Sequence, residues 1–176
     1  NVSAFSIVSG TGILNAIASI STGPSTGPRA VTVEPSGRFA YVVNATTNEV
    51  RQFSIQLNGA LAAIGVPFPL AVTAAPRAVT VDPTGRFLYV ANTGTSTVSA
   101  YLIAAADGSL TELTGSPFPV AVGPVSLSVD PLGRFLYVAS GTSGNVSAFV
   151  IDQVTGDLGV PSLVSVTSPQ SIAVDL

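Results

Sequence analysis

Short stretches in which apolar and polar residues alternate recur along the whole chain, separated by Pro, Gly, Asn and Asp. Residues 78–81, 87–91, 98–103 and 110–120 are examples, and they are rich in Val, Phe, Tyr and Thr. Segments rich in these residue types, in which apolar and polar side chains alternate, predict β-strands. In 87–91 both faces of the expected strand are apolar, which is typical of a sheet that is covered on both sides.

The expected strands belong to a repeat of the sequence. The segment 28–44 recurs at 76–92 and at 124–140, so that the prolines that begin the copies lie 48 residues apart, and a fourth copy starts at Pro169. The link 82–85 between the first two strands reads Asp-Pro-Thr-Gly. Pro presets φ in a tight turn and Gly tolerates positive φ, so this link predicts an antiparallel hairpin.

Small antiparallel sheets of four strands, buried on both faces and repeated every ~45 residues, are typical of a β-propeller. The sequence therefore predicts an all-β fold with about 3.75 blades in one domain, 1–176. We place three complete blades at 28–75, 76–123 and 124–168. We expect a further blade to be shared between the two ends of the chain, with two strands from 1–27 and one from 169–176.

The composition excludes several classes of function. The chain has six basic and nine acidic residues, no Lys, and a net charge of -3, which leaves no basic patch for a nucleic acid. It has neither Cys nor His, so it offers no thiolate or imidazole ligand for a metal and no imidazole base. We expect no metal and no cofactor. The most apolar segment, 60–72, is interrupted by Gly and Pro and is too short to span a membrane.

An acidic residue and an arginine recur four residues apart in each repeat. The pairs are Glu34 and Arg38, Asp82 and Arg86, and Asp130 and Arg134. A ring of carboxylates could bind a cation such as Ca²⁺. Because the pair is present in every complete repeat, we favour a structural role, in which the acid accepts turn amides and the arginine pairs with it or lies across the next aromatic ring.

A less regular set of polar residues is expected around one mouth of the central channel. Arg29 and Arg77 follow the proline that begins the first strand, whereas the other copies carry Val125 and Gln170 there. The candidate ligand-binding residues are Arg29, Arg77, Gln170, Asn44 and Asn92, the two asparagines coming from the link after the second strand. Guanidinium and amide groups could hold a carboxylate, a phosphate or a sugar. The alternative is that they only satisfy carbonyls of the loops.

The run PRAVTVDPTGRFLYVAN at 76–92, followed by STVSAY and DGSLTEL, resembles the YVTN-type repeat of bacterial and archaeal surface propellers. It is equally similar to the propeller family named after 6-phosphogluconolactonase, which shares a T-G-x-L turn, here at 155–158. The resemblance implies a propeller with either a surface role or lactonase activity. Lactone hydrolysis needs a general base and a group that stabilises the oxyanion. The histidine and acidic positions of the lactonase family have no match in this sequence.

From these observations we expect a scaffold or binding module that is secreted, periplasmic or at the cell surface, with a lactone hydrolase whose catalytic residues lie partly outside this segment as the alternative. No Met is present, which predicts a processed or excised chain. Its unpaired strand edges predict either self-association or pairing with the remaining blades of a longer protein. A small acidic compound or a sugar is the expected ligand. The Asn-x-Ser/Thr triplets at Asn1, Asn44 and Asn145 are expected to be accidental.

Overall fold

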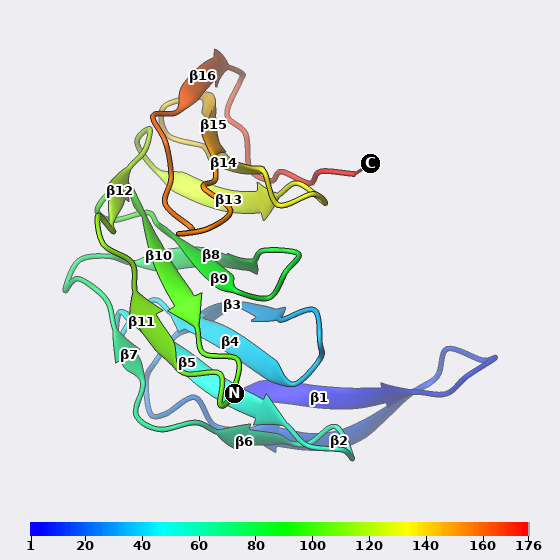
Figure 1. The fold of residues 1–176 in the computed structure, drawn as a ribbon. Coiled ribbons are helices and arrows are strands. Elements are labelled where there is room, and N and C mark those ends of the chain that lie inside the picture. Colours follow the sequence, from blue (N-terminus) through cyan, green and yellow to red (C-terminus); the bar gives the residue numbers. More distant parts are fainter. Residues whose placement is uncertain (176) are drawn as a thin grey trace.

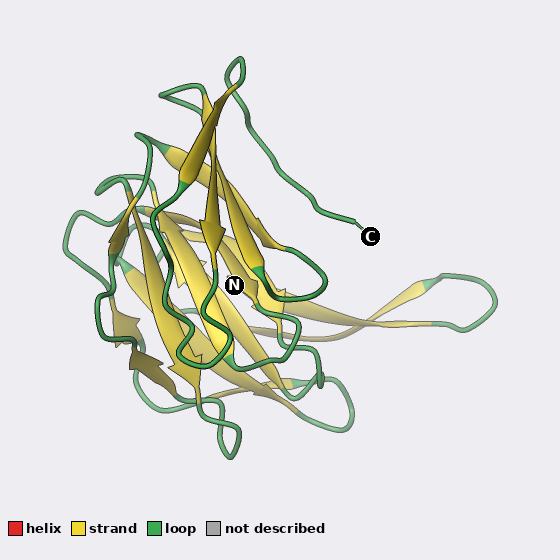
Figure 2. Ribbon diagram, turned by 45° about the horizontal axis from the view of Figure 1, so that its top comes forward, coloured by secondary structure: helices red, strands yellow, loops and turns green. Residues whose placement is uncertain are grey.

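The computed structural model describes residues 1–175, and over that range it consists of β-strands joined by turns and loops (Figures 1 and 2). The strands form antiparallel sheets that follow one another along an arc, from the blue hairpin at the N-terminus to the orange strand near the C-terminus. The predicted all-β propeller fold is confirmed. Within the described part of the chain no helix has the length and apolarity needed to cross a membrane.

Each blade is a small sheet whose strands follow their order in the sequence. The first, incomplete sheet is a hairpin of β1 (Val2–Ile7) and β2 (Leu14–Ile20). The second sheet contains β3 (Pro28–Val33), β4 (Phe39–Asn44), β5 (Glu49–Ile55), β6 (Leu61–Ala63) and β7 (Phe68–Pro69). The third contains β8 (Pro76–Val81), β9 (Phe87–Asn92), β10 (Thr97–Ile103), β11 (Leu110–Glu112) and β12 (Phe118–Pro119). The fourth contains β13 (Pro124–Val129), β14 (Phe135–Ser140), β15 (Asn145–Val150) and β16 (Ser162–Ser165).

The first strands of the three larger sheets lie side by side along the arc. β3 contacts β8, and β8 in turn contacts β13. Each of these strands pairs with only one neighbour in its own sheet, so its other edge faces the axis around which the blades are arranged. The residues of these first strands are therefore the ones closest to a central channel.

The outer strand of a blade is less regular than expected. We predicted one strand over 110–120, but the structure has two short strands, β11 and β12, which pair with opposite ends of β10. The loop between them contains Gly115, whose φ is 93°, and Pro117. Proline has no N–H to donate to a sheet and glycine relaxes the backbone, so the ladder is interrupted there.

The predicted first strand of the fourth copy is not formed: residues 169–175 contain no strand. In the other copies this strand pairs with the second strand after the tight turn, and residues 169–175 have no such partner among the described residues. The predicted shared blade is also not formed within one chain. The β1–β2 hairpin makes a sheet of its own, and it lies at the opposite end of the arc from the C-terminus (Figure 1).

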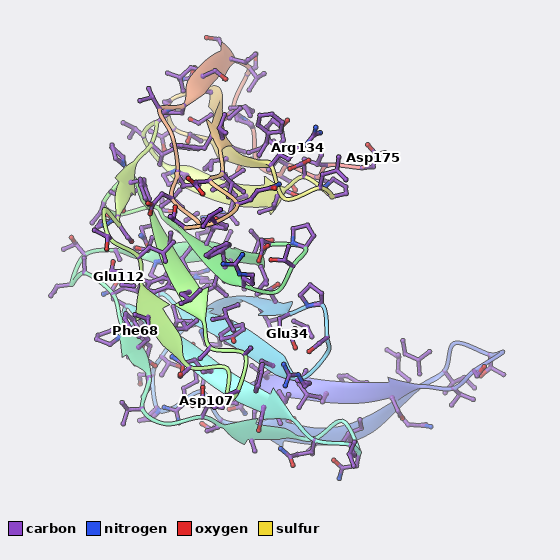
Figure 3. All side chains as sticks on the ribbon, in the orientation of Figure 1. Glu34, Phe68, Asp107, Glu112, Arg134 and Asp175 are labelled. Atoms are coloured by element: carbon purple, nitrogen blue, oxygen red, sulfur yellow. The ribbon has the colours of Figure 1, made fainter. Side chains whose placement is uncertain are left out.

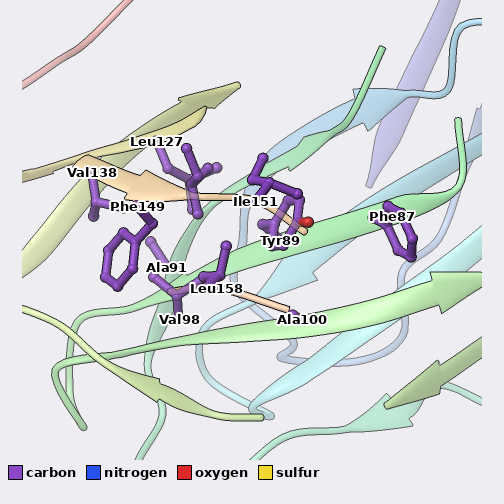
Figure 4. Close-up of a cluster of buried hydrophobic side chains, with 11 residues drawn as sticks. Phe87, Tyr89, Ala91, Val98, Ala100, Leu127, Val138, Phe149, Ile151 and Leu158 are labelled. Carbon is purple, nitrogen blue, oxygen red and sulfur yellow. The ribbon is translucent and has the colours of Figure 1, made fainter. Parts of the chain in front are cut away.

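The core lies between adjacent blades. Every residue of β4 and β9 is buried, and Tyr41 and Tyr89 have no exposed surface. Figure 4 shows the cluster between the third and fourth sheets, formed by Phe87, Tyr89, Ala91, Val98, Ala100, Leu127, Leu136, Val138, Phe149, Ile151 and Leu158. The prediction that the second strand is apolar on both faces is confirmed for β4 and β9, because the second and third sheets each pack against a neighbour on both sides. Truncation of one such aromatic side chain to alanine typically costs about 3–5 kcal/mol.

Candidate functional site at the channel mouth

The arc has two rims that differ in chemistry. The turn rim consists of the links 34–39, 82–87 and 130–135 between the first and second strands. The mouth rim is the opposite end of the same hairpins, where the first strands begin and the second strands end. In Figure 3, Glu34 and Arg134 lie on the turn rim, on the side away from Phe68 and Glu112.

The carboxylates of the turn rim accept hydrogen bonds from backbone amides. Glu34 accepts hydrogen bonds from the amides of Ser36, Arg38 and Phe39 at 2.7, 2.8 and 3.2 Å. Burial alone would raise the pKa of Glu34, but a hydrogen bond from the Ser36 hydroxyl together with these amide donations outweighs it and holds the pKa below its ordinary value of 4.5. The structural interpretation of the repeated acid is confirmed. Among residues 1–175 no group of three or more acidic side chains is arranged to hold a metal ion.

The repeated arginines lie across the aromatic residues that follow them. The guanidinium carbon is 5.0 Å from the ring centroid of Phe39 for Arg38, and 4.8 and 5.5 Å from the corresponding rings for Arg86 and Arg134. These are cation–π distances. The turn rim is therefore a structural motif that closes each hairpin, as its repetition predicted.

Arg29 and Arg77 occupy β-bulges at the mouth rim. Pro28 pairs with Asn44 and Ala30 with Val43, so Arg29 is an extra residue with no partner across the ladder. Arg77 has the same place in the next blade. A bulge turns a side chain away from the regular alternation of a strand. Both arginines are exposed, and neither guanidinium has a hydrogen bond or an ion pair to another described residue.

In the remaining copies, uncharged residues occupy the position that corresponds to Arg29 and Arg77. Val125 is the bulged residue of β13. Gln170 lies beside it, because both approach the position that a Cβ of Gly141 would occupy, to 3.7 and 3.0 Å. Gln170 is exposed and donates through Nε2 to the carbonyl of Ser168 at 3.3 Å. The structure therefore places Arg29 and Arg77 at neighbouring steps of one rim, with Val125 at the next step and Gln170 beside Val125.

The two predicted asparagines are placed differently. Asn44 and Asn92 are buried, with exposed fractions of 0% and 2%. Asn44 donates to Glu49 at 2.8 Å, and Asn92 donates to Ser99 at 2.8 Å. They brace the link between the second and third strands and do not present amides to solvent. Glu49 lies at the start of the third strand, where the other copies have the uncharged residues Thr97 and Asn145.

Arg29 lines a cleft of about 290 Å³ between β1 and β3, together with Asn1, Ser3 and Val31. The cleft therefore combines one guanidinium with a hydroxyl, an amide and an apolar wall. With Arg77 on the adjacent strand, the mouth rim offers two unpaired cations. Such groups bind a carboxylate or a phosphate through paired N–H donors.

The family described as lactonase, 7-bladed β-propeller, matches residues 1–174 of the chain. A comparison with curated protein sequences gives no significant match. Solved structures, in contrast, match the chain with high similarity of fold.

One similar structure is the periplasmic gluconolactonase of Pseudomonas aeruginosa, with 27% identity, a TM-score of 0.76, and coverage of 85% of this chain and 43% of that one. A candidate 6-phosphogluconolactonase of Bacteroides uniformis has 23% identity and a TM-score of 0.85, with 94% and 49% covered. A protein of Lactobacillus plantarum has 20% identity and a TM-score of 0.84, with 96% and 50% covered. The chain thus spans about half the length of the structures that it matches.

Proposed function

Because the chain belongs to the lactonase family of seven-bladed β-propellers, we propose that it provides the anion-binding part of a lactone-hydrolysing propeller. In this proposal Arg29 and Arg77 bind the carboxylate or phosphate of an acidic sugar derivative at the channel mouth. The similarity to a gluconolactonase supports this substrate class.

The observation that carries the proposal is the state of the two arginines. Arg38, Arg86 and Arg134 all contact a protein acceptor and an aromatic ring, whereas Arg29 and Arg77 have neither. A bulge on each of two adjacent strands directs both side chains to the same rim. In this proposal the two unpaired guanidiniums on adjacent strands form the site for the anion, because guanidinium N–H groups bind a carboxylate or a phosphate through paired hydrogen bonds.

The chain contributes binding in this proposal, and the general base comes from elsewhere in the propeller. Lactone hydrolysis requires a base to activate water. The sequence has no His, and the carboxylates of Glu34 and Asp130 are held in the charged form by turn amides on the opposite rim. Glu49 is near the mouth but is bonded to Asn44. The arginines would also stabilise the negative charge that develops on the lactone oxygen.

Titration calorimetry of the chain with 6-phosphogluconate and gluconate tests the proposal. We expect both acids to bind, and Arg29→Ala or Arg77→Ala to weaken binding about 10-fold to 100-fold, as loss of a charged hydrogen bond of about 1.5–3 kcal/mol predicts. Asn58→Asp is the matched control, because it lowers the net charge by the same amount on an exposed turn and keeps the side-chain oxygen that accepts the amide of Ala60. Equal binding by the arginine variants and the wild type would contradict the proposal.

A second candidate is a recognition module without catalysis, located in the periplasm or outside the cell. It is favoured by one observation, that the carboxylates of the turn rim are bound to the backbone and unavailable as bases. An assay of δ-gluconolactone hydrolysis by the intact parent protein distinguishes the two functions. Turnover that is lost in Arg77→Ala supports the hydrolase, whereas arginine-dependent binding without turnover supports the recognition module.

A further inference from the structure

A cleft between the second and third sheets plays no part in the proposed function. It has a volume of about 260 Å³. Residues 69–71, at the end of β7, form one wall, and the third sheet forms the others, mainly through β10, β11 and the loop 113–117. Glu112, which lines the cleft, lies on the side of the arc away from Glu34 of the turn rim (Figure 3). The two sheets share a buried apolar cluster, so the cleft lies between blades that are in contact and is not left by a missing neighbour.

The third sheet departs from the repeat at the positions that line this cleft. Cross-strand pairing relates each position to its equivalent in the second sheet, since Glu112 pairs with Tyr101 as Ala63 pairs with Phe53. The equivalent positions are Ser99 and Arg51, Tyr101 and Phe53, Glu112 and Ala63, and Ser116 and Val66. At three of the four, the third sheet has a hydroxyl or a carboxylate where the second sheet has an apolar side chain. Departures from a repeat that gather at one cleft are typical of a recognition site.

Tyr101 carries a hydroxyl that the packing of the core does not require. Phe53 and Phe149 hold the same repeat position and are 0% and 1% exposed, and Tyr101 is 1% exposed. Its ring packs edge to face against Phe68, with 5.0 Å between the ring centroids. Burial raises the pKa of Tyr101 by more than the hydroxyl of Ser99 lowers it. The phenol therefore keeps its proton at neutral pH and can donate a hydrogen bond in the cleft.

A buried amide orients the hydroxyls of the same wall. Asn92 is 2% exposed, and its Nδ2 donates to Oγ of Ser99 at 2.8 Å and to Oγ1 of Thr97 at 3.2 Å. Because both oxygens act as acceptors there, the hydroxyl hydrogens of Ser99 and Thr97 are directed to other groups. Thr97 shares a hydrogen bond of 2.9 Å with Thr95. Ser99 and Tyr101 thus present adjacent hydroxyls to the cleft.

The acceptor of the cleft is the carboxylate of Glu112. Its Oε1 accepts a hydrogen bond from the hydroxyl of Ser116 at 2.9 Å, and Ser116 accepts one from the amide of Ala100 at 3.0 Å. These bonds hold the carboxylate in place while its second oxygen keeps its capacity to accept. No basic residue lines the cleft, so its charge is negative, in contrast to that of the mouth rim.

We propose that this cleft binds the ring of a neutral sugar. Sugar hydroxyls both donate and accept hydrogen bonds, so they can donate to Glu112 and accept from Ser99 and Tyr101. Pro69 and Leu70 supply an apolar wall for the C–H face of the ring. The negative charge of Glu112 disfavours the acidic compounds that we expect at the mouth rim. The cleft is therefore a second site, and it does not depend on whether Arg29 and Arg77 bind an anion.

Nuclear magnetic resonance of the ¹⁵N-labelled chain tests the site. The probes are the methyl glycosides of glucose, galactose and mannose, each added to about 50 mM, which detects dissociation constants in the millimolar range. At least one of them should shift the amide signals of residues 97–101 and 112–116 with saturation, whereas gluconate should not. If none of the three shifts these signals, the proposal is overturned.

Tyr101→Phe is the sharpest variant, because it restores the residue that holds this position in the second and fourth sheets. The variant should fold normally and bind the sugar about 3-fold to 10-fold more weakly, as one lost hydrogen bond predicts. Tyr137→Phe is the matched control, because it removes a hydroxyl from a half-buried tyrosine of the fourth sheet, outside the cleft. Equal affinities of the two variants for the sugar would contradict the proposal.

The carboxylate is tested by Glu112→Ala, which reproduces Ala63 of the second sheet. It should weaken sugar binding by about 3-fold to 10-fold. Arg29→Ala should leave sugar binding unchanged, and a loss in that variant would place the sugar at the mouth rim and overturn the proposal. Methylammonium and calcium chloride are the competing probes. If either shifts the cleft signals and the sugars do not, the cleft is a cation site and the proposal is wrong.

Discussion

The two rims of the arc differ in how far their polar groups are satisfied. On the turn rim each acidic side chain accepts at least two backbone amides, and each arginine lies across a ring. On the mouth rim Arg29 and Arg77 are exposed and unpaired among the described residues. The turn rim repeats the same residue types in all three complete blades, whereas the mouth rim changes from arginine to Val125 and Gln170.

This difference shows why a repeated residue and a variable residue should be interpreted differently in a propeller. Every blade must close its hairpin and hold its neighbour, so the residues that do so recur with the repeat. A ligand at the channel mouth contacts each blade from a different side, so the residues that bind it need not recur. The repeated acids and arginines accordingly stabilise the fold, and the variable arginines are the better candidates for recognition.

The largest expected effect is the loss of a turn-rim carboxylate. Asp82 accepts the amides of Thr84, Arg86 and Phe87 at 3.0, 2.8 and 2.7 Å. Asp82→Ala leaves these donors without their acceptor and should lower the free energy of unfolding by about 3–5 kcal/mol. Urea denaturation followed by circular dichroism measures this. Arg77→Ala on the other rim is the control and should change the free energy by less than about 0.5 kcal/mol. Similar losses for the two variants would remove the distinction between the rims.

The pH dependence of stability tests the same rim without a mutation. Burial would raise the pKa of Glu34 and of Asp130, but hydrogen bonds from the Ser36 hydroxyl to Glu34 and from turn amides to both carboxylates outweigh it and hold the two pKa values below 4.5 and 3.8. A carboxyl whose pKa is lower in the folded state stabilises the fold above its unfolded pKa. Stability should therefore be constant from pH 7 to about 5 and should fall as the pH drops below about 4.

Urea midpoints measured between pH 7 and pH 3 check this expectation. Glu34→Gln should lower the stability at pH 7 and flatten the decline at acid pH, because the substituted side chain has no proton to gain. Arg29→Ala should leave the shape of the pH profile unchanged. A decline of the same steepness in Glu34→Gln and in the wild type would show that this carboxylate does not contribute to the pH dependence.

A smaller effect is expected from a turn-rim arginine that binds the next blade. Arg86→Gln loses two hydrogen bonds to carbonyls and its contact with the ring of Phe87. It should reduce the free energy of unfolding by about 1–2 kcal/mol. Arg77→Gln makes the same chemical change at the mouth and should be neutral within about 0.5 kcal/mol. Thermal or urea unfolding of the pair sharpens the comparison, and a reversed order would contradict it.

The smallest expected effect is a gain in the affinity of the mouth rim for an anion. Val125→Arg puts a third guanidinium at the bulge that carries Arg29 and Arg77 in the other blades. It should tighten the binding of 6-phosphogluconate about 2-fold to 10-fold at low salt, and the gain should shrink as ionic strength rises. Calorimetry at two salt concentrations measures it. Leu132→Arg, on the turn rim, adds the same charge away from the mouth and should give no gain.

Much of the fold could be predicted because its signals are local. Alternation in 87–91 indicates a strand that is buried on both faces, and the Asp-Pro-Thr-Gly link indicates the hairpin before it. The repeat then specifies how many such units follow. The prediction of one strand over 110–120 was wrong in its middle, where the structure has a loop between β11 and β12. Gly115 and Pro117 interrupt the strand there, although the other residues of the segment are typical of a strand.

The candidate site was predicted only in part. Arg29 and Arg77 could be singled out because the residue at this position varies between copies. Whether their guanidiniums have partners depends on a β-bulge, which the residue types at these positions do not predict. Asn44 and Asn92 were predicted at the same rim from their residue type and their place at the end of the second strand. Their amides are instead buried against the start of the third strand. The partner of a polar group depends on distances across strands, which sequence spacing alone does not determine.

By itself, the sequence determined the elements of this protein: strands of period two, tight turns with Pro and Gly, and a 48-residue unit that requires neighbours on both faces. These features depend on residues a few positions apart. The tertiary structure decided which groups are satisfied, because the decisive contacts join residues far apart in the chain, such as Tyr89 and Gly156, 67 positions away. For the same reason Phe149 is buried while Phe5, in an identical stretch of sequence, is half exposed: burial depends on which blade lies next to a residue.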